Sequence, residues 1–272
     1  SDLKNKLGTF NFAKLYPDRH FCIPLEENTM ISMAAGMTIR TNLPICFGEA
    51  YLLITKGFEA LRNSVALPNL NIKIIASSSG ISNIEEGPTH ICLEDIAIMR
   101  TLHYETKAAL EYAINTYGPV YIRLPDAPID NIYDQNYQFE IGKPQIIKNG
   151  NQVTILSYGL MLHYSLAAAH QLEKRGVSVQ VINIPSISPL NQKWFHEHID
   201  PTHPIFIIED HHQNGGLGSI IMELFANQPS RKIIKITPQN LNESGKLNEI
   251  LKRQGLDSNG IYERIKKFYL SN

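Results

Sequence analysis

Apolar residues in the second half of the chain fall into short continuous runs that alternate with longer stretches of helical spacing. Residues 153–158 form one β-rich run, and residues 161–174 follow it as a helix with one apolar side. The other elements that this pattern predicts are strands at 177–184, 204–208 and 232–236, a helix at 220–226, and helices beginning at Ser244 and Asn259. Strands that are apolar throughout and alternate with helices indicate a parallel sheet covered on both faces.

The first half of the chain has the same rhythm. Its predicted elements are helices at 30–39, 53–65, 92–102 and 106–115, and strands at 43–47, 71–76 and 120–124. A polar, turn-rich segment from about Asp126 to Gln152 separates the two halves. The pattern therefore predicts an α/β protein with two tandem three-layer domains, residues 1–140 and 141–272, each built on a mainly parallel sheet.

The predicted helices at 92–102 and 106–115 follow one another almost directly at Leu102 and His103. Two helices on a parallel sheet should be separated by a strand, because a right-handed crossover returns to the sheet between them. Either a strand has been deleted there, or residues between Leu102 and His103 have been closed up in the numbering. The second explanation is favoured, and a Cα–Cα distance far above about 3.8 Å would indicate it.

Composition excludes several classes of partner. The formal net charge of −1 over 272 residues gives no electrostatic reason to expect nucleic acid or an anionic membrane surface. No apolar run approaches the roughly 20 residues that span a bilayer, and the first residues lack the apolar core of a secretory signal. Three scattered cysteines favour reduced thiols in a cytoplasmic protein. The ten histidines lack zinc-site spacing, so no metal site is predicted.

A series of short segments carries a resemblance to a known family. In the first half they are LEENTMISMAAG at 25–36, FEALRN at 58–63, LPNLNIKII at 67–75, GIS at 80–82, EEGPTH at 85–90 and LEDIA at 93–97. In the second half they are GPVYIR at 118–123, VIN at 181–183, ED at 209–210 and GGLGS at 215–219. This order resembles the pyrimidine-binding domain of transketolases followed by their C-terminal domain, particularly in transketolases encoded as two subunits. The resemblance runs from about Phe12 to near the end, and it implies the thiamin diphosphate pyrimidine-binding fold.

The resemblance implies a catalytic and cofactor-binding role for Glu27. In this family a glutamate at a helix start hydrogen-bonds a ring nitrogen of the aminopyrimidine of thiamin diphosphate, and counting back from Gly36 places it at Glu27, not Glu26. A carboxyl group there favours the imino tautomer, which can take the proton from the thiazolium carbon. Acid–base work of this kind is typically worth ~10²–10⁴ in rate. The alternative is an acid that stabilises the positive end of a helix.

Two further residues match substrate-binding positions of the family. His90 matches a histidine that helps to bind and protonate substrate oxygens, which implies a catalytic role as well. Glu86 stands where the family usually has an aspartate facing substrate hydroxyls. The turn between them would present both side chains from a loop at a sheet edge. The alternatives are a helix-capping acid for Glu86 and a buried, hydrogen-bonded histidine for His90.

Two cofactor-binding positions depart from the family pattern. An aromatic side chain normally covers the cofactor ring, but Glu49 stands at that position and Leu52 at a second aromatic position nearby. Phe47 and Tyr51 lie two residues to either side of Glu49. In an extended chain this is about 7 Å, so neither is expected to take over the role. Glu49 would be a second carboxylate near Glu27, and like charges in a partly buried site favour protonation of one of them.

Two substrate-binding positions also depart from the pattern. Ser78 stands where the family has a substrate histidine. Asp126 replaces an arginine that usually grips the sugar phosphate, and an acid there would repel a phosphate. The hypothesis is that the enzyme transfers a two-carbon ketol unit between sugars, one of which is non-phosphorylated or otherwise atypical. Sugars or sugar phosphates are thus the expected substrates.

The chain has no Gly-Asp-Gly followed by Asn, the pattern with which this superfamily binds the metal and diphosphate of the cofactor. The loop at 215–219 opens a helix and could hold an anion, but in this family it is structural. The resemblance therefore implies a partner, an N-terminal transketolase subunit that carries the diphosphate-binding domain and most of the Mg²⁺ or Ca²⁺ ligands. The expected assembly is α2β2.

Two alternative functions stay open beside a split transketolase. One is the beta subunit of a 2-oxo acid dehydrogenase first component, which shares the architecture and the glutamate; residues 86–97 favour transketolase. The other is a non-catalytic or regulatory subunit. Glu49 and Ser78 favour that alternative, whereas Glu27 and His90 argue against it.

Overall fold

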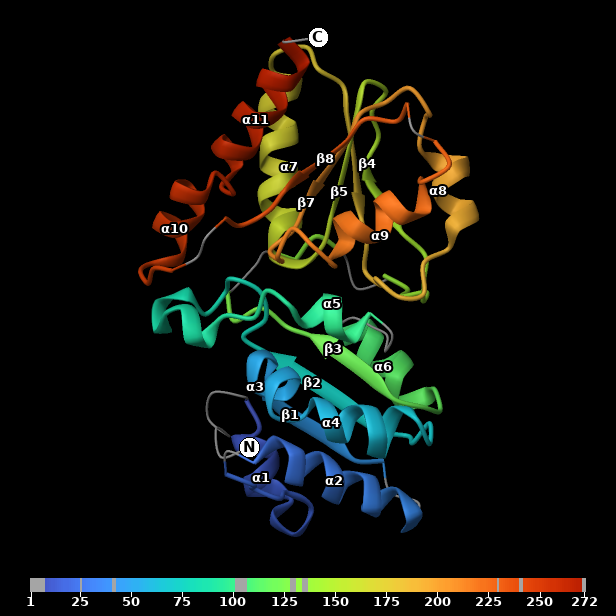
Figure 1. The fold of residues 1–272 in the computed structure, drawn as a ribbon, viewed down its shortest axis with the longest axis vertical. Coiled ribbons are helices and arrows are strands. Elements are labelled where there is room, and N and C mark those ends of the chain that lie inside the picture. The colour runs from blue at the N-terminus through green and yellow to red at the C-terminus, as the bar shows by residue number, and fades with distance from the viewer. Residues whose placement is uncertain are drawn as a thin grey trace.

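The protein divides into two α/β bodies. The computed structural model describes residues 8–24, 26–40, 43–100, 107–127, 131–133, 137–228, 230–239 and 242–270. Its strands form one sheet of three, in the order β1-β2-β3, and one of five, in the order β4-β6-β5-β7-β8. We call the part around the first sheet the first domain, at the bottom of Figure 1, and the part around the second sheet the second domain, at the top.

The first domain has a fully parallel sheet. Its elements are α1 (Phe10–Leu15), η1 (Pro17–Arg19), α2 (Glu27–Met37), η2 (Thr38–Arg40), β1 (Ile45–Glu49), α3 (Ala50–Thr55), α4 (Phe58–Ala60), the π-helical turn η3 (Leu61–Ala66), β2 (Lys73–Ser77), the 3-10 turns η4 (Ile84–Glu86) and η5 (Pro88–His90), α5 (Asp95–Met99), α6 (Lys107–Asn115) and β3 (Val120–Arg123). Ile45 lies beside Lys73, and Lys73 lies beside Val120.

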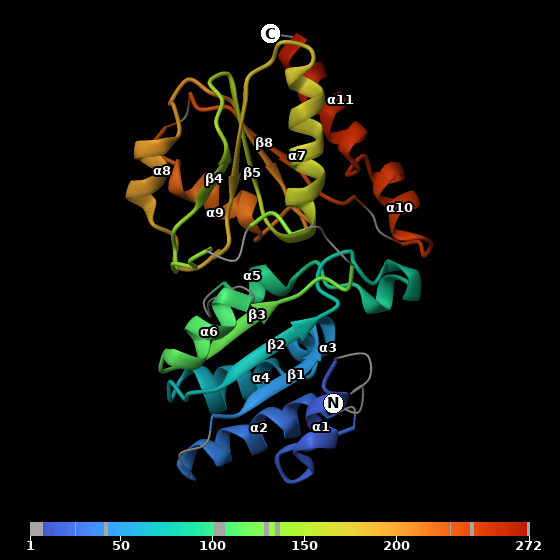
Figure 2. The same ribbon diagram turned by 180° about the vertical axis from the view of Figure 1, so that it is seen from behind.

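Helices cover both faces of this sheet because its strands carry apolar side chains in both directions. On one face, Ile31 of α2 and Leu53 of α3 belong to a buried cluster with Ile74 of β2. On the other face, Ala113 of α6 packs in a second cluster with Ile122 of β3. Figures 1 and 2 show α2 and α6 on opposite sides of the three strands.

The sheet of the second domain is parallel except at the edge formed by one strand. Its elements are β4 (Gln145–Lys148), β5 (Val153–Ser157), α7 (Gly159–Glu173), β6 (Val179–Asn183), α8 (Gln192–His198), β7 (Ile205–Ile208), α9 (Leu217–Leu224), β8 (Ile233–Ile236), α10 (Leu247–Gln254) and α11 (Ser258–Leu270). The edge strand β4 is antiparallel to β6, and the other neighbouring pairs are parallel. Every residue of β5, β6 and β7 is buried, as expected of strands covered on both faces.

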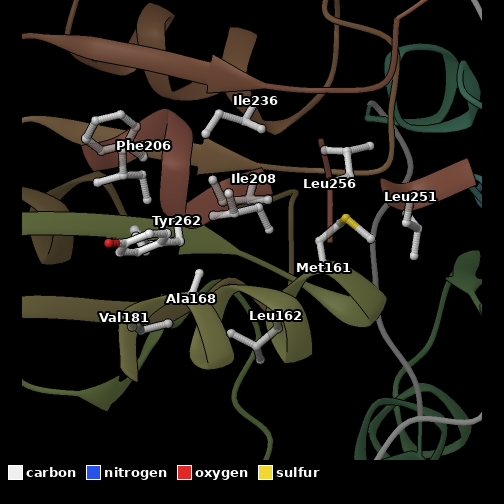
Figure 3. Close-up of a cluster of buried hydrophobic side chains, with 14 of the residues drawn as sticks. Met161, Leu162, Ala168, Val181, Phe206, Ile208, Ile236, Leu251, Leu256 and Tyr262 are labelled. Carbon is white, nitrogen blue, oxygen red and sulfur yellow. The ribbon is translucent and has the colours of Figure 1, made fainter. Parts of the chain in front are cut away.

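Two clusters fill the spaces on either side of this sheet. Figure 3 shows the larger one, in which Met161 and Leu162 of α7, Phe206 and Ile208 of β7, and Tyr262 of α11 come together. The smaller cluster lies between the opposite face of the sheet and the helices α8 and α9. Burying apolar area contributes about 25 cal/mol per Å², so these clusters stabilise the second domain.

The α/β architecture with two tandem, mainly parallel sheets is confirmed, and the differences are local. Strand β4 lies inside the segment that the sequence marks as turn-rich, because an edge strand has a short and weak apolar pattern. Helix α8 was not predicted either, although Asn191 caps it by accepting a hydrogen bond from the Trp194 amide at 3.1 Å. The predicted helix at 53–65 is instead three short helical pieces, α3, α4 and η3.

Two further predictions stay untested. The junction between Leu102 and His103 lies outside the described residues, so neither explanation for it is decided. The domain boundary near residue 140 also stays a prediction. The described strands of the first domain end at Arg123, and those of the second begin at Gln145.

Candidate functional site

The carboxyl ends of the three parallel strands bring polar side chains to one edge of the first domain. Glu49 is the last residue of β1, Ser78 directly follows β2, and Asp126 comes three residues after the end of β3. Loops at this edge of an open parallel sheet commonly carry functional groups, because the rigid strands fix where the loops begin.

Glu27 reaches the same edge from a helix. Helix α2 precedes β1, and its eleven residues span about 16 Å, close to the length of the five residues of β1. Since the C-terminus of α2 leads to the start of β1, its N-terminus lies near the end of that strand. Glu27, the first residue of α2, is only 2% exposed.

The Glu27 carboxyl group is incompletely satisfied. Its Oε2 atom is buried and has no hydrogen-bond partner among the described residues. A buried polar atom without a partner costs about 1–3 kcal/mol, so native proteins rarely keep one that no ligand or water contacts. A ring nitrogen of an aminopyrimidine that shares a proton with the carboxyl group would satisfy this oxygen, and the site at Glu27 therefore fits the pyrimidine of thiamin diphosphate.

Close packing of α2 against α3 fixes the position of Glu27. A Cβ atom added at Gly57, which lies between α3 and α4, would be 3.4 Å from the Cβ of Glu27. It would also be 2.6 Å from Cδ1 of Ile31 and 2.8 Å from the carbonyl oxygen of Leu53. Only glycine leaves room for α2 to approach α3 this closely, and that approach places the Glu27 side chain.

Ser78 contacts two acids that, like it, depart from the family pattern. The Ser78 hydroxyl lies 3.5 Å from Oε1 of Glu49 and 3.2 Å from Oδ2 of Asp126, and it can donate its proton to either carboxylate. Glu49 and Ser78 are buried, whereas Asp126 is exposed. Ser78 has a φ of +53°, which a non-glycine residue adopts only when its surroundings hold it there. The edge of the sheet thus presents two acids bridged by a serine.

The loop that follows Ser78 holds more buried polar atoms. The Ser82 hydroxyl donates to the carbonyl oxygen of Ser79 at 2.7 Å and accepts from the amide of Asp126 at 3.0 Å. In contrast, Oγ of Ser79 and Nδ2 of Asn83 are buried without a hydrogen-bond partner among the described residues. Such atoms indicate contact with a ligand or with ordered water.

Helix α3 changes the expected positions of the neighbouring aromatic residues. It begins at Ala50, so Tyr51 lies in a helical turn, and the expectation of an extended chain between Glu49 and Tyr51 is wrong. The Tyr51 ring centroid lies 5.2 Å from that of His90. Leu52, at the second expected cofactor position, is buried in α3 and presents only an aliphatic side chain.

His90 and Glu86 lie together, as the turn between them predicts. Nε2 of His90 is 3.5 Å from Oε2 of Glu86, and Nδ1 of His90 is 3.0 Å from the hydroxyl of Thr89. The His90 side chain is 35% exposed and that of Glu86 is 46% exposed, so solvent and ligands reach both. The pair therefore offers a donor and an acceptor to neighbouring hydroxyl groups.

Arg123, the nearest arginine along the chain to Asp126, is committed to two other acids. Its Nε donates to Oδ2 of Asp95 at 2.8 Å, and its Nη1 donates to Oδ1 of Asp210 at 3.0 Å. Its Nη2 also donates to the carbonyl oxygen of Asp210 at 3.2 Å. This buried network joins the two domains, so Arg123 does not replace the arginine that the family pattern has near Asp126.

Backbone amides of the glycine-rich loop at 215–219 already bind an acidic side chain of the protein. The Glu209 carboxylate accepts hydrogen bonds from the amides of Leu217 at 2.8 Å and Gly218 at 2.9 Å. Burial raises the pKa of Glu209 to about 7, although these amides oppose the rise. The structural role expected of this loop agrees with these contacts.

The described part of the chain contains no group of three or more His, Cys, Asp or Glu side chains that could hold a metal ion. No helix within that part is long and apolar enough to cross a membrane. Cys22 is exposed, and Cys46 and Cys92 are buried.

Sequence reasoning missed two features of this edge. It did not predict the contact between Tyr51 and His90, because the helix that brings the two rings together was expected to begin at residue 53. It also gave Arg123 no structural role. The buried acid at Asp210 was visible in the sequence, but its contact with Arg123 spans 87 positions along the chain and depends on the domain packing.

Comparison with known proteins places these features in one family. The model of the transketolase pyrimidine-binding domain matches residues 1–128, and that of the transketolase C-terminal domain matches residues 142–261. A protein of Methanocaldococcus jannaschii, named as a transketolase C-terminal section, is 34% identical over 281 residues, which cover 97% of this chain and 87% of that protein. The transketolase of Mus musculus is 31% identical over 279 residues, covering 97% of this chain.

The chain spans only 44% of the length of the mouse transketolase, so it matches less than half of that enzyme. Among solved structures, one titled "Split gene transketolase, inactive beta4 tetramer" has a TM-score of 0.87 and 27% sequence identity. The match covers 98% of this chain and 89% of that chain. Both domains, their order and the arrangement of their sheets agree with these matches, and the chain belongs to the transketolase family, with its pyrimidine-binding and C-terminal domains in tandem.

Proposed function

We propose that this chain is the pyrimidine-binding subunit of a thiamin diphosphate-dependent enzyme that transfers a two-carbon ketol unit between sugars. The observation that carries the proposal is the buried Glu27 carboxyl group, whose Oε2 atom has no hydrogen-bond partner among the described residues. In the bound enzyme, Glu27 holds a ring nitrogen of the aminopyrimidine. Thiamin diphosphate supplies the electron sink for breaking and forming the carbon–carbon bond beside a ketone.

Other residues of this chain act on the substrate in this proposal. His90 and Glu86 bind sugar hydroxyls, and His90 moves a proton to or from a substrate oxygen. The support is their separation of 3.5 Å on a partly exposed loop. Glu49 and Leu52 form the wall near the cofactor, without the aromatic ring that the family pattern has there.

We also propose that an N-terminal transketolase subunit completes the site, in an α2β2 assembly. The partner would carry the diphosphate-binding domain and most of the ligands to Mg²⁺ or Ca²⁺. The names of the archaeal relative and of the split-gene structure support this arrangement. Exposed aromatic and aliphatic side chains at the start of the chain support it as well, since α1 has no buried residue; they are Phe10, Phe12, Leu15, Tyr16 and Phe21.

The substrate in this proposal is an atypical sugar, with hydroxyl groups and not a phosphate at the edge formed by Glu49, Ser78 and Asp126. Two carboxylates within hydrogen-bond reach of one serine favour donors such as hydroxyls over a phosphate dianion. The buried, unsatisfied atoms of Ser79 and Asn83 in the following loop support a polar ligand.

Reconstitution tests the proposal. The chain is purified alone and with the N-terminal subunit from the same source, and ketol transfer is measured with thiamin diphosphate and Mg²⁺. Activity that requires both subunits supports the proposal. Decarboxylation of pyruvate in place of ketol transfer would indicate a 2-oxo acid dehydrogenase component. A stable complex that binds no cofactor would indicate a non-catalytic subunit, the alternative that the carboxylate of Glu49 favours.

A further inference from the structure

His90 is contacted on three sides by side chains from two segments of the chain. Glu86 lies at Nε2, with a separation of 3.5 Å, and Thr89 lies at Nδ1, with a separation of 3.0 Å. The ring of Tyr51 lies against the imidazole at a centroid distance of 5.2 Å and an interplanar angle of 56°. The loop itself thus occupies both ring nitrogens, and a second segment adds a contact with the ring.

The backbone of the loop fixes two of these contacts. Glu86 ends one 3-10 turn and His90 ends the next, with Gly87 between them at a φ of +92°. The amide of Glu86 donates to the carbonyl oxygen of Asn83 at 3.2 Å, and the amide of His90 donates to that of Gly87 at 3.0 Å. Because both turns are closed by hydrogen bonds, the Cα atoms of Glu86 and His90 keep a fixed separation.

The third contact comes from helix α3. Tyr51 is in its first turn, directly after the end of β1 at Glu49. The helix packs against α5, and Leu53, two residues after Tyr51, is completely buried. The Tyr51 ring is thus presented from a rigid element, and it limits rotation of the imidazole about its bond to Cβ.

The two nitrogen contacts also select one form of the neutral ring. An ionised carboxylate only accepts hydrogen bonds, so a contact between Glu86 and Nε2 requires a proton on Nε2. Nδ1 then carries a lone pair, which accepts the proton of the Thr89 hydroxyl. Both contacts are satisfied by the Nε2–H tautomer, whereas the Nδ1–H tautomer would set a lone pair against the carboxylate.

We propose that Glu86 and Thr89 hold His90 in its Nε2–H tautomer and that Tyr51 limits rotation of its ring, so that the Glu86–His90 pair meets the sugar substrate in one fixed arrangement. Thr89 and Tyr51 are then positioning residues that act through His90. This inference rests on the proposed function for the role of His90, but the tautomer itself is a property of this chain and is measured without cofactor or partner.

Nuclear magnetic resonance of the full-length chain labelled with ¹⁵N tests the tautomer directly. Long-range ¹H–¹⁵N spectra of histidine rings are recorded at a pH about two units above the usual histidine pKa of about 6.5. The His90 signals are assigned by their loss in His90→Asn. We expect the Nε2–H pattern in the wild type, a mixture of tautomers in Thr89→Val, and the wild-type pattern in Tyr51→Phe. A wild-type Nδ1–H pattern, or an unchanged pattern in Thr89→Val, would overturn the tautomer assignment.

Kinetics of the reconstituted complex test the positioning role. Thr89→Val and Tyr51→Leu should lower kcat/KM for the sugar about tenfold while leaving the affinity for thiamin diphosphate unchanged, because misplacement of a group reduces the rate without removing the cofactor contact. Tyr51→Phe retains the ring and should restore the wild-type value. If Tyr51→Leu equals the wild type in kcat/KM, Tyr51 has no positioning role. If all variants are inactive through lost cofactor binding, the residues are structural and the inference fails, whatever the fate of the proposed function.

Discussion

Arg123 Nη1 lies 3.0 Å from Oδ1 of Asp210, and this contact joins the last strand of the first domain to the loop after β7 of the second. The same guanidinium holds Asp95 at 2.8 Å and lies over the ring of Tyr158 at 5.4 Å from its centroid. Close backbone approach accompanies the pair, since a Cβ atom at Gly80 would be 1.9 Å from Oδ2 of Asp210. The two domains therefore depend on this buried cation for their packing.

Replacing Arg123 should destabilise the protein strongly. Arg123→Met keeps much of the volume but leaves Asp95 and Asp210 buried without their cation, which costs about 3–5 kcal/mol. In a chain of this size, such a loss lowers the midpoint of thermal unfolding by about 10 °C. The control is Lys143→Ala, which breaks an exposed pair with Glu140 and should cost at most about 1 kcal/mol. Equal midpoints for the two variants would show that the buried ion pairs of Arg123 stabilise the protein no more than the exposed pair does.

Acidification should weaken the same interface through His211. Its Nε2 accepts a hydrogen bond from the amide of Ala97 at 3.2 Å, and burial lowers the pKa of His211 to about 4. As pH falls from about 6.5 to about 4, His211 becomes protonated in the unfolded chain but stays neutral in the folded chain. The free energy of unfolding therefore decreases by on the order of 3 kcal/mol. His211→Gln keeps an acceptor but does not titrate.

The measurement is the unfolding free energy of wild type and His211→Gln across this pH range. The difference between the two proteins isolates His211 because the other titrating groups are common to both. We expect the wild type to lose stability relative to the variant as pH falls. Parallel curves would show that His211 does not titrate in this window.

Gly57 should be required for the position of Glu27. Gly57→Ala forces a Cβ atom within 2.6 Å of Ile31 and 2.8 Å of the Leu53 carbonyl, which costs about 1–3 kcal/mol and shifts α2. The matched control is Gly36→Ala, on the exposed side of the same helix with no atom within 4 Å of the added Cβ; it should be neutral or stabilise by about 0.5–1 kcal/mol. Thermal unfolding compares them, and equal stability would show that the approach of α2 to α3 is not tight.

Much of the fold could be predicted because most strands of the two mainly parallel sheets are short apolar runs bounded by polar residues. The runs at 153–158 and 204–208 correspond to β5 and β7, which are buried throughout. Strand β4 could not be predicted in this way, since all four of its residues are only partly buried. In the predicted helix at 53–65, only Gly57 signals the break between α3 and α4, and no proline marks the π-helical turn at 61–66.

The local parts of the candidate site could be predicted, and the parts that depend on tertiary packing could not. Glu86 and His90 are four residues apart, so their contact depends only on one local loop. The contact between Ser78 and Asp126 spans 48 residues and depends on the neighbouring positions of β2 and β3 in the sheet. The contact between Tyr51 and His90 depends on where α3 begins, a boundary that sequence patterns place only within a few residues.

Changing Asp126 should alter the preference for phosphorylated sugars. Asp126→Arg exchanges a negative charge for a cation that binds phosphate, and it should raise kcat/KM for a phosphorylated acceptor relative to a non-phosphorylated one by about tenfold or more. Glu197→Arg, at an exposed acid of α8, makes the same change of two charge units and is the control for overall charge. The ratio of the two kcat/KM values in the reconstituted complex is the readout, and an unchanged ratio would remove Asp126 from substrate selection.

The most direct test of the account is the effect of Glu27→Gln on thiamin diphosphate binding and ketol transfer by the complex with the N-terminal subunit. The substitution keeps the size of the side chain and removes the carboxylate beside the proposed ring nitrogen. We expect an intact complex whose ketol transfer is lower by ~10²–10⁴, the usual worth of a positioned acid–base group. Wild-type rates in Glu27→Gln, or a wild-type complex that binds no thiamin diphosphate, would contradict the account.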